Sequence, residues 1–323
     1  RHARIPRGPA MKLLRRVITV PLATAVMIGI LAAWPVLLVI GGVAGLIARS
    51  SLPVRTLGVL MAYAVLELRA LWTLLRGGQD CDEFVSDVLE RAYTVGRRTL
   101  NLGVLLDDAS PGPEQLPREV PVIVLSRHCG PGDTLLVAWL LNIHYRLRLR
   151  IVLKALLRCE PVLDLVGDLG GLSFLHHRSA KARKQIHDLA ASLGGGQALL
   201  LFPEGGNFTW GRWRAAIERL RSSGRLREAR RAWRQTHTLP PRTGGTAAAL
   251  AGAPDADVLV LTHTGFSPDG RARAWWRLPM NRRLLVRTVL GPAAELPSPD
   301  QLAPWLERTW SNVDAWVAGH INS

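Results

Sequence analysis

Two side chains that could activate a hydroxyl group lie five positions apart in Ser-Arg-His-Cys-Gly-Pro-Gly-Asp, residues 126–133. His128 follows a short apolar run, and Asp133 follows a Gly-Pro-Gly turn. Positions five apart on a continuous helix do not face each other. A loop that folds back, however, can bring the carboxylate to one imidazole nitrogen and leave the other nitrogen for a substrate. The segment therefore predicts a histidine general base that is oriented by an aspartate.

The same two residues also have structural explanations. A histidine near a strand end is often structural, and an aspartate at a helix start is commonly an N-cap. The free N–H groups of such a helix start would in addition suit an anion or a developing oxyanion. Taken alone, residues 126–133 favour the structural explanation.

A second polar segment, Phe-Pro-Glu-Gly-Gly-Asn at residues 202–207, follows another apolar run. Pro203 cannot donate a hydrogen bond to a sheet and marks a strand end. Glu204 should therefore emerge at the carboxyl edge of the sheet, where α/β folds place their sites. Gly205 and Gly206 would let a ligand approach the backbone. The alternative is an ordinary strand-to-helix turn with a solvated glutamate.

Alternating strands and helices are expected to position these segments. We predict strands at residues 120–125, 150–153, 197–202 and 257–262, and helices at residues 133–141, 180–193, 214–234 and 299–318. Short apolar runs between turn residues indicate buried strands. Their alternation with helices predicts an α/β fold with a mainly parallel sheet flanked by helices.

The N-terminal part of the chain has the composition of a membrane segment. Residues 17–48 contain no charge, and a spanning helix needs only about 20 apolar residues. Pro35 and the Gly41-Gly42 pair predict a kink or a tight turn within this stretch. Residues 57–75 are also apolar but include two charges, so they are expected to lie at the interface or to form a weaker second span. A buried helix of a soluble domain also fits this second stretch.

Six basic residues and no acidic one precede residue 17. The positive-inside rule then places the N-terminus in the cytoplasm. The three cysteines show no paired spacing, which is consistent with a reducing compartment. We therefore expect a membrane anchor at residues 1–77 and a catalytic domain at residues 78–323 on the cytoplasmic side of the cell membrane.

The chain has 41 Lys and Arg against 25 Asp and Glu, a net charge of +16. Such an excess favours an anionic partner: a nucleic acid, an anionic membrane lipid or a phosphorylated substrate. Residues 212–234 alone hold nine arginines and two glutamates, together with two tryptophans. This segment could contact an anionic lipid surface or the phosphates of CoA, or it could be a solvated helix face. Nothing else in the sequence supports a nucleic-acid partner.

Together, the two polar segments resemble the glycerolipid acyltransferase family, which includes the lysophosphatidate acyltransferases. The resemblance rests on His-x4-Asp after one strand and Phe-Pro-Glu-Gly after another, and it extends over roughly residues 120–265. Segments that begin at Lys154, Phe174 and Pro241 are similar to three further blocks of the family. An apolar N-terminal segment is also usual in it.

The chain departs from the family pattern in two places. The arginine of the Phe174 block lies one residue later than usual, so His177 or Arg178 occupies the phosphate-binding position. The family's common Glu-Gly-Thr-Arg is replaced by Glu-Gly-Gly-Asn, which removes an arginine that could hold a phosphate. Gly206 is closer to the glycerol-3-phosphate branch, although that branch keeps the arginine, and Asn207 fits the lysophospholipid branch better.

The resemblance implies direct acyl transfer without an acyl-enzyme, and it implies neither a metal nor a cofactor. His128 would take the proton of the acceptor hydroxyl, Asp133 would hold the imidazole, and the hydroxyl would attack the thioester of acyl-CoA or acyl carrier protein. The acceptor would be a lysophospholipid, in the first place 1-acylglycerol-3-phosphate, with phosphatidate as the product. Cys129 could be imagined as a nucleophile, but family members usually have another residue there, and we interpret it as incidental.

The resemblance also assigns substrate contacts. Glu204 and Gly205 would position the glycerol part of the acceptor, and Arg178 would lie near its phosphate. The remaining candidate substrate-binding residues are Gly206, His177, Lys154 and Asn207.

Three other functions stay open. The acceptor could be lysocardiolipin, another lysophospholipid, glycerol-3-phosphate or a glycolipid. A membrane-attached, metal-dependent phosphoesterase could use His176, His177 and His263 with Asp133. A basic, membrane-tethered binding module without catalysis is the third possibility.

Overall fold

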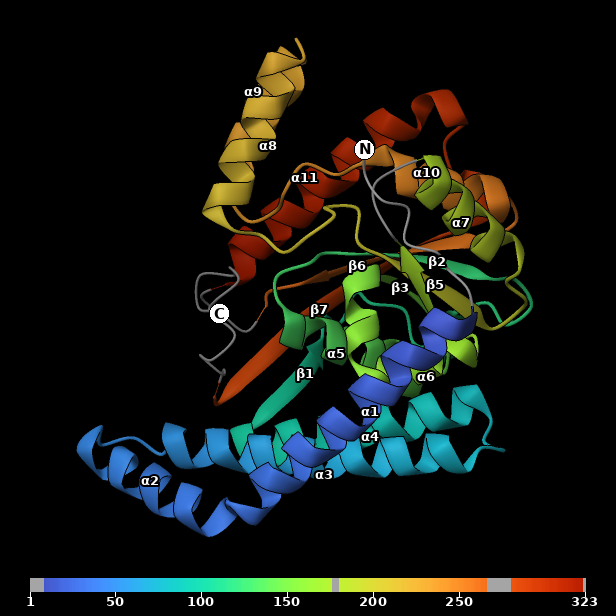
Figure 1. Cartoon of the computed structure of the whole chain (residues 1–323). Coiled ribbons are helices and arrows are strands. Elements are labelled where there is room, and N and C mark those ends of the chain that lie inside the picture. Colours follow the sequence, from blue (N-terminus) through green and yellow to red (C-terminus); the bar gives the residue numbers. More distant parts are fainter. Residues whose placement is uncertain (1–8, 176–179, 266–279, 322–323) are drawn as a thin grey trace. The chain divides into compact units, whose positions relative to one another are not determined.

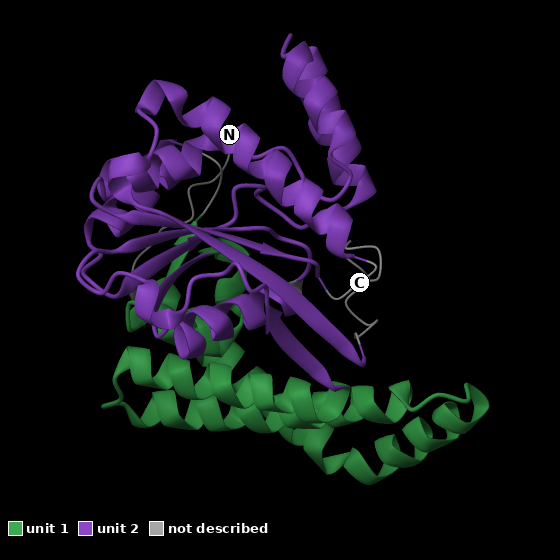
Figure 2. Cartoon of the chain, turned by 180° about the vertical axis from the view of Figure 1, so that it is seen from behind, with its two compact units in different colours: residues 1–100, 153–176 green, residues 101–152, 177–323 purple. Residues whose placement is uncertain are grey.

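The protein was analysed as a computed structural model, which describes residues 9–175, 180–265 and 280–321. The chain forms two compact units, which Figure 2 colours separately. Unit 1 comprises residues 1–100 and 153–176, and unit 2 comprises residues 101–152 and 177–323.

Three apolar helices begin unit 1, drawn in blue in Figure 1: α1 (Pro9–Ala32), α2 (Trp34–Ile47) and α3 (Leu52–Arg76). By length and composition, Met11–Ala32 and Leu52–Arg76 could each cross a membrane. None of the most apolar part of the first helix is buried within the protein, as expected for a surface that faces lipid. These helices are consistent with the predicted membrane anchor, and the side of the membrane stays a prediction.

The kink or tight turn predicted within residues 17–48 is confirmed, and it lies just before Pro35, between α1 and α2. Pro35 lies in the first turn of α2, where its missing N–H breaks no helical hydrogen bond. Gly41 and Gly42 both lie inside α2. A Cβ at Gly41 would lie 3.5 Å from the Leu57 side chain of α3, so this glycine lets two helices approach and does not make a turn.

The rest of unit 1 covers one face of α3. It consists of α4 (Cys81–Leu100), a 3-10 turn η3 (Ala155–Cys159), α6 (Pro161–Asp168) and β4 (Leu172–Leu175). Leu71 of α3, Phe84 of α4, and Val162 and Val166 of α6 share one buried cluster. The compact unit therefore extends past the predicted boundary at residue 77, because the helices that follow bury the apolar face of α3.

A buried carboxylate links α6 to the start of α1. Asp164 is 3% exposed, and its two oxygens accept from Arg15 Nη2 at 2.5 Å and from Arg16 Nε at 2.8 Å. Arg16 also pairs with Asp168 at 2.7 Å. Burial alone would raise the pKa of Asp164, but the hydrogen bonds and charges of the two arginines lower it below its ordinary value.

Unit 2 is built on a sheet with the strand order β1-β7-β6-β2-β5-β3. The bounds are β1 (Leu102–Leu106), β2 (Val122–Ser126), β3 (Arg148–Lys154, which enters unit 1 at Leu153), β5 (Gln197–Leu201), β6 (Asp257–His263) and β7 (Arg282–Gly291). All pairs in this order are parallel except β6 with β7. The predicted mainly parallel sheet is therefore confirmed.

Helices lie on both faces of this sheet in Figure 1, with α7, α10 and α11 on one side and α5 on the other. Their bounds are α5 (Pro131–Trp139), α7 (Ala180–Ala191), α8 (Trp210–Ser222), α9 (Leu226–Arg234), α10 (Thr243–Gly252) and α11 (Leu302–His320). Short helical turns occur at Pro113–Gln115, Leu140–His144, Ala293–Glu295 and Pro299–Gln301. Every residue of the central strand β2 is buried, as a strand covered on both faces requires.

The four predicted strands and four predicted helices of this region are confirmed with boundary shifts of a few residues. The basic helix expected at residues 214–234 is interrupted around Gly224, which has φ +76°, so that it forms α8 and α9. The sequence analysis did not predict β1 or β7. Arginines recur along β7, so the strand lacks the apolar run that marks the others.

We predict that Asp164→Asn destabilises the folded protein by roughly 2–4 kcal/mol, because it removes a buried carboxylate that pairs with two half-buried guanidinium groups and leaves Arg15 without that partner. Unfolding of the detergent-solubilised protein would measure this loss. The folded pKa of Asp164 lies below its unfolded value, so the difference should be present at neutral pH and vanish as the pH falls through the acid range.

Asp188→Asn provides the matched control. Asp188 pairs with Lys184 at 2.8 Å, and both side chains are more than half exposed, so the loss should be much smaller than that of Asp164→Asn. Equal stability of the two variants would contradict a structural role for Asp164.

Candidate active site

The two polar segments meet at one edge of the sheet. β2 and β5 are parallel neighbours with Leu125 opposite Leu201, so the chain leaves both strands at the same edge. The backbone N–H of Phe208 donates to the carbonyl of His128 at 3.1 Å. The imidazole of His128 lies against the ring of Phe202, with 4.5 Å between the ring centroids. The predicted meeting of these segments is confirmed.

Glu204 ties the segments together through its carboxylate. Oε1 accepts from the backbone N–H of His128 at 3.0 Å, and Oε2 accepts from the backbone N–H of Leu239 at 2.8 Å. The side chain is 1% exposed. Glu204 therefore positions the His128 loop from inside the protein, and its predicted contact with substrate stays a prediction.

A buried arginine, which the sequence analysis did not single out, stands directly before the histidine. Arg127 is 0% exposed. Its Nη1 donates to the carbonyl of His263 at 2.7 Å, and its Nη2 donates to the carbonyl of His237 at 2.8 Å. The sequence did contain a signal for this role. An arginine that directly follows a buried apolar strand is expected to be buried as well, and a buried charge needs hydrogen-bond acceptors.

Burial and the positive charge of Arg127 shift the pKa of Glu204 in opposite directions. Burial raises the pKa of Glu204 to about 7, and it would raise the pKa further without the positive charge of Arg127, the two backbone N–H groups and the nearby Trp310 indole. The carboxylate therefore changes its charge near neutral pH.

His263 is a structural residue of the same region. It is 0% exposed, and its Nε2 lies 2.9 Å from the carbonyl of Arg127, which makes Nε2–H the donor. Burial, followed by the charge of Arg127, lowers the pKa of His263 to about 3. The ring is thus neutral at physiological pH and holds the backbone just ahead of His128.

Asp133 lies in the first turn of α5 but does not cap the helix. The N-cap is Gly130, in an extended conformation. Asp133 is 4% exposed, and a Cβ at Gly130 would lie 3.6 Å from its Oδ2. The carboxylate is therefore folded back over the 128–133 loop, as a partner of His128 must be. Direct contact between the two side chains stays a prediction.

Cys129 is packed inside this loop. It is 2% exposed, and a Cβ at Gly265 would lie 2.7 Å from its Sγ. Burial, with the negative charges of Asp133 and Glu204, raises the pKa of the Cys129 thiol well above its ordinary value. A buried neutral thiol is a poor nucleophile, which agrees with our interpretation of Cys129 as incidental.

The turn after Glu204 has the backbone that its glycines allow. Gly205 has φ +68°, a left-handed conformation that favours glycine. Asn207 follows Gly206, and both its carbonyl and its Oδ1 accept from Arg212 Nη1, at 3.1 and 3.3 Å. This contact orients Asn207 toward the start of α8.

Of the other predicted substrate residues, one belongs to unit 1 and two are not described. Lys154 is exposed at the end of β3 and belongs to unit 1. His177 and Arg178 lie outside the described residues. The roles of all three stay predictions.

The described residues contain no group of three or more His, Cys, Asp or Glu side chains that could hold a metal ion. His263 is engaged by backbone, and His176 and His177 lie outside the described part of the chain. The geometry therefore lends no support to a metal-dependent phosphoesterase.

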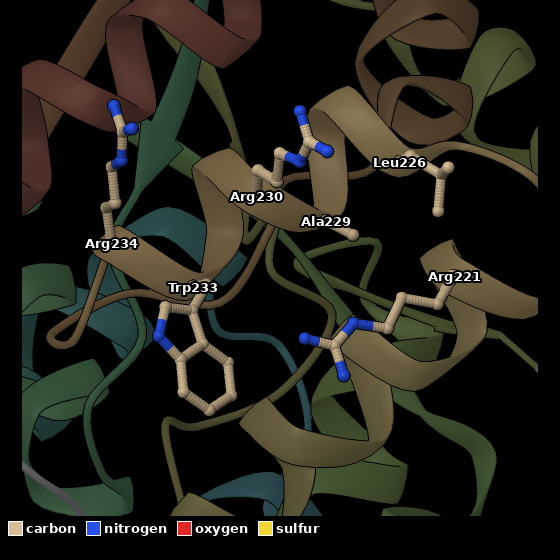
Figure 3. A pocket seen from close by; sticks show the side chains of 6 residues that line it. All are labelled: Arg221, Leu226, Ala229, Arg230, Trp233 and Arg234. Atoms are coloured by element: carbon tan, nitrogen blue, oxygen red, sulfur yellow. The ribbon is translucent and has the colours of Figure 1, made fainter.

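A separate pocket lies on the basic hairpin of α8 and α9 (Figure 3). Its volume is about 380 Å³, and it is lined by Arg221, Leu226, Ala229, Arg230, Trp233 and Arg234. Leu226 and Trp233 are more than half exposed, and the guanidinium of Arg221 lies 5.6 Å from the Trp233 ring centroid. The lining offers positive charge and apolar surface but no base or nucleophile. Contact with lipid or with CoA phosphates stays a prediction for this hairpin.

Comparison with known proteins agrees with this geometry. Residues 110–262 match the family model described as Acyltransferase. The fold matches the crystal structure of the 1-acyl-sn-glycerophosphate (LPA) acyltransferase PlsC from Thermotoga maritima, with a TM-score of 0.56 and 16% sequence identity over 82% of this chain and 94% of that chain. A search of curated proteins gives no match.

We predict that Glu204→Gln removes a pH dependence from the stability of the protein, because the amide has no proton to lose where the carboxyl group of Glu204 ionises. The folded pKa of Glu204, about 7, is raised above its usual 4.5. The stability advantage of the wild type over the variant should therefore be largest below pH 4.5 and decrease by roughly 3 kcal/mol as the pH rises to 7.

Unfolding of the wild-type and Glu204→Gln proteins over this pH range tests the assignment. Glu218→Gln is the control, because Glu218 is exposed on α8. A wild-type advantage that grows with pH would show that Glu204 is not a buried group of raised pKa.

Proposed function

Because the chain carries a domain of the acyltransferase family at residues 110–262, we propose that it transfers a fatty acyl group to the free hydroxyl of a lysophospholipid. The acceptor in this proposal is 1-acylglycerol-3-phosphate, and the product is phosphatidate. His128 is the general base, and Asp133 orients its imidazole.

The observation that carries the proposal is the bond between Glu204 and the backbone of His128. It joins the His-x4-Asp loop and the Phe-Pro-Glu-Gly turn into one site at the carboxyl edge of the sheet. Both segments lie within the part of the chain that matches the family. The fold match to a protein whose name states acyl transfer to 1-acyl-sn-glycerophosphate supports the choice of acceptor.

The reaction in this proposal is a direct transfer. His128 removes the hydroxyl proton while the hydroxyl oxygen attacks the carbonyl carbon of a thioester, from acyl-CoA or acyl carrier protein. The tetrahedral intermediate then expels the thiolate, which takes the proton from the imidazolium. The carboxylate of Asp133 stabilises the imidazolium, and the N–H groups at the start of α5 stabilise the oxyanion.

The loop is built to hold His128 in place during proton transfer. The backbone N–H of His128 donates to Glu204, and its carbonyl accepts from Phe208. The imidazole ring packs on Phe202. The side chain itself is only partly buried, so one ring edge can meet an acceptor. Such restraint keeps the base in reacting geometry without closing the site.

The membrane segment fits a lipid acceptor and a lipid product. Both have acyl chains that stay in a bilayer, and the apolar helices α1 and α3 would keep the enzyme at that surface. We propose that the catalytic domain lies on the cytoplasmic side, where acyl-CoA and acyl carrier protein are made.

We predict that His128→Ala lowers kcat for acyl transfer by about 10²–10⁴-fold, and that Asp133→Asn lowers it by about 10–10³-fold, because each removes part of the base. Purified wild-type and variant enzymes would be assayed with acyl-CoA and acyl carrier protein donors. The acceptor panel contains lysophosphatidate, lysocardiolipin, other lysophospholipids, glycerol-3-phosphate and a glycolipid.

His187→Ala is the matched control, since this histidine is exposed on α7. Complementation of a conditional lysophosphatidate acyltransferase mutant gives a second readout, in which the wild type and the control should rescue growth and His128→Ala should not. Rescue by all three would contradict the assignment of His128 as the general base. If the enzyme acylates only another acceptor of the panel, that acceptor replaces lysophosphatidate in the proposal.

A further inference from the structure

The hairpin of α8 and α9 buries one side of each helix and exposes the other. Its core contains Trp213 and Ile217 of α8 and Ala229 and Ala232 of α9. All nine arginines of residues 212–234 are exposed: Arg212, Arg214, Arg219, Arg221, Arg225, Arg227, Arg230, Arg231 and Arg234. The core of the hairpin therefore contains none of these charges, and together they form a basic outer surface.

Few of these charges are compensated by carboxylates. Within the part of the chain that the structure describes, two of the nine arginines form ion pairs: Arg225 with Glu228, and Arg231 with Glu307. The remaining acidic residue of the hairpin is Glu218, which is exposed on α8. Like charges close together repel one another, and an anionic partner would relieve this repulsion.

Apolar side chains are exposed among the arginines. Leu226 is 56% exposed, Trp233 is 55% exposed and Trp210 is 41% exposed. The rings of Trp210 and Trp233 both pack on the buried Trp213, with centroid distances of 5.2 and 5.0 Å. Figure 3 shows the Arg221 side chain reaching from α8 toward the Trp233 ring. The surface thus combines positive charge with exposed rings that are held in place by a buried one.

This combination fits a bilayer with anionic lipids better than it fits an acidic protein. Tryptophan favours the interface between membrane and water, and an anionic leaflet attracts basic side chains. The helices Met11–Ala32 and Leu52–Arg76 could each cross a membrane. A chain anchored by such helices keeps its other surfaces at a high effective concentration near a bilayer, so a weak lipid contact can form.

We propose that the α8–α9 hairpin docks on the headgroup region of a bilayer that contains anionic phospholipids. Arg221, Arg230 and Arg234 bind lipid phosphates, and Trp233 and Leu226 lie among the headgroups. These side chains line a pocket of about 380 Å³, which gives one headgroup a place between the arginines. The inference goes beyond the proposed acyl transfer and does not depend on it.

Hydrogen exchange of the intact chain in lipid nanodiscs tests the proposal. One set of discs contains phosphatidylcholine alone, and the other also contains phosphatidylglycerol. The backbone amides of α8 and α9 should exchange more slowly in the anionic discs, because the contact opposes local opening of the helices. High salt should remove this difference, since it screens exposed charges. The amides of β2 should exchange equally in both sets.

Substitution of the arginines separates charge from helix stability. The triple variant Arg221→Gln, Arg230→Gln and Arg234→Gln should weaken docking about fivefold for each arginine and roughly 100-fold in all. Lysine at the same three positions should preserve docking, because a lipid surface attracts the charge and does not require the planar guanidinium group. Wild-type exchange of β2 in both triple variants would show that they are folded.

A matched control removes three charges elsewhere. Lys181→Gln, Arg282→Gln and Arg308→Gln change exposed positions on α7, β7 and α11 and should leave the slow exchange of the hairpin as in the wild type. Equal exchange of the wild-type hairpin in both sets of discs overturns the proposal, and so does full slowing in the glutamine variant of the hairpin. Slowing by acyl carrier protein in neutral discs, with none by anionic lipid, would assign the surface to an acidic protein instead.

Fluorescence quenching locates the Trp233 ring. Phosphatidylglycerol with brominated acyl chains should quench the wild type more than Trp233→Phe, whose ring can still pack on Trp213, and equal quenching would contradict the docked position of Trp233. A chain that docks but transfers no acyl group would refute the proposed function and keep the lipid surface. An active enzyme whose hairpin does not respond to anionic lipid would refute the lipid surface alone.

Discussion

The carboxylate of Glu204 joins the two segments of the site, and because it is buried the surrounding residues must compensate its charge. A carboxylate taken out of water is tolerated only where hydrogen bonds and positive charge compensate it. The N–H groups of His128 and Leu239 supply the bonds, and Arg127 supplies the charge. Arg127 is itself buried and needs acceptors, which the carbonyls of two residues from distant segments provide. The backbone of His128, the proposed base, is thus positioned by a network in which each member requires the next.

The hairpin of α8 and α9 extends this network outward. The chain enters it through Phe208, whose N–H bonds the carbonyl of His128, and leaves it near Leu239, whose N–H bonds Glu204. Between these points the hairpin has its own small core around Trp213. The indole Nε1–H of Trp213 donates to two backbone carbonyls at the C-terminal end of α9. An exposed basic surface is therefore attached at one end to the loop that carries His128 and at the other end to Glu204.

Much of the fold and the centre of the site could be predicted from local patterns. Buried parallel strands read as short apolar runs, which is why β2, β5 and β6 were found within a few residues of their bounds. The polar residues directly after β2 and β5 could be assigned to one sheet edge because parallel neighbours end at the same side. β7 was not recognised, because arginines interrupt its apolar residues. Its pairing with β1 and β6 stabilises it as a strand, and this pairing cannot be seen in the local sequence. The packing of Phe84 and Val162 on α3 could not be predicted for a related reason, since it is a contact between segments far apart in the chain.

By itself, the sequence determined the residue types of the catalytic loop, the order of the strands along the chain and the presence of long apolar helices, because each depends on neighbours within a few positions. Only the tertiary structure decided what those residues touch. It buried the side chain of Glu204, which was expected to contact the acceptor or, in the alternative, to face solvent, and it made Gly130 the helix cap in place of Asp133. It also brought Arg212 and Arg242 to the turn that lacks an arginine of its own. The hydrogen bonds of Glu204 with His128 and Leu239 join residues 76 and 35 positions apart, and only folding can choose such partners, because loop closure lets many alternatives compete at similar entropic cost.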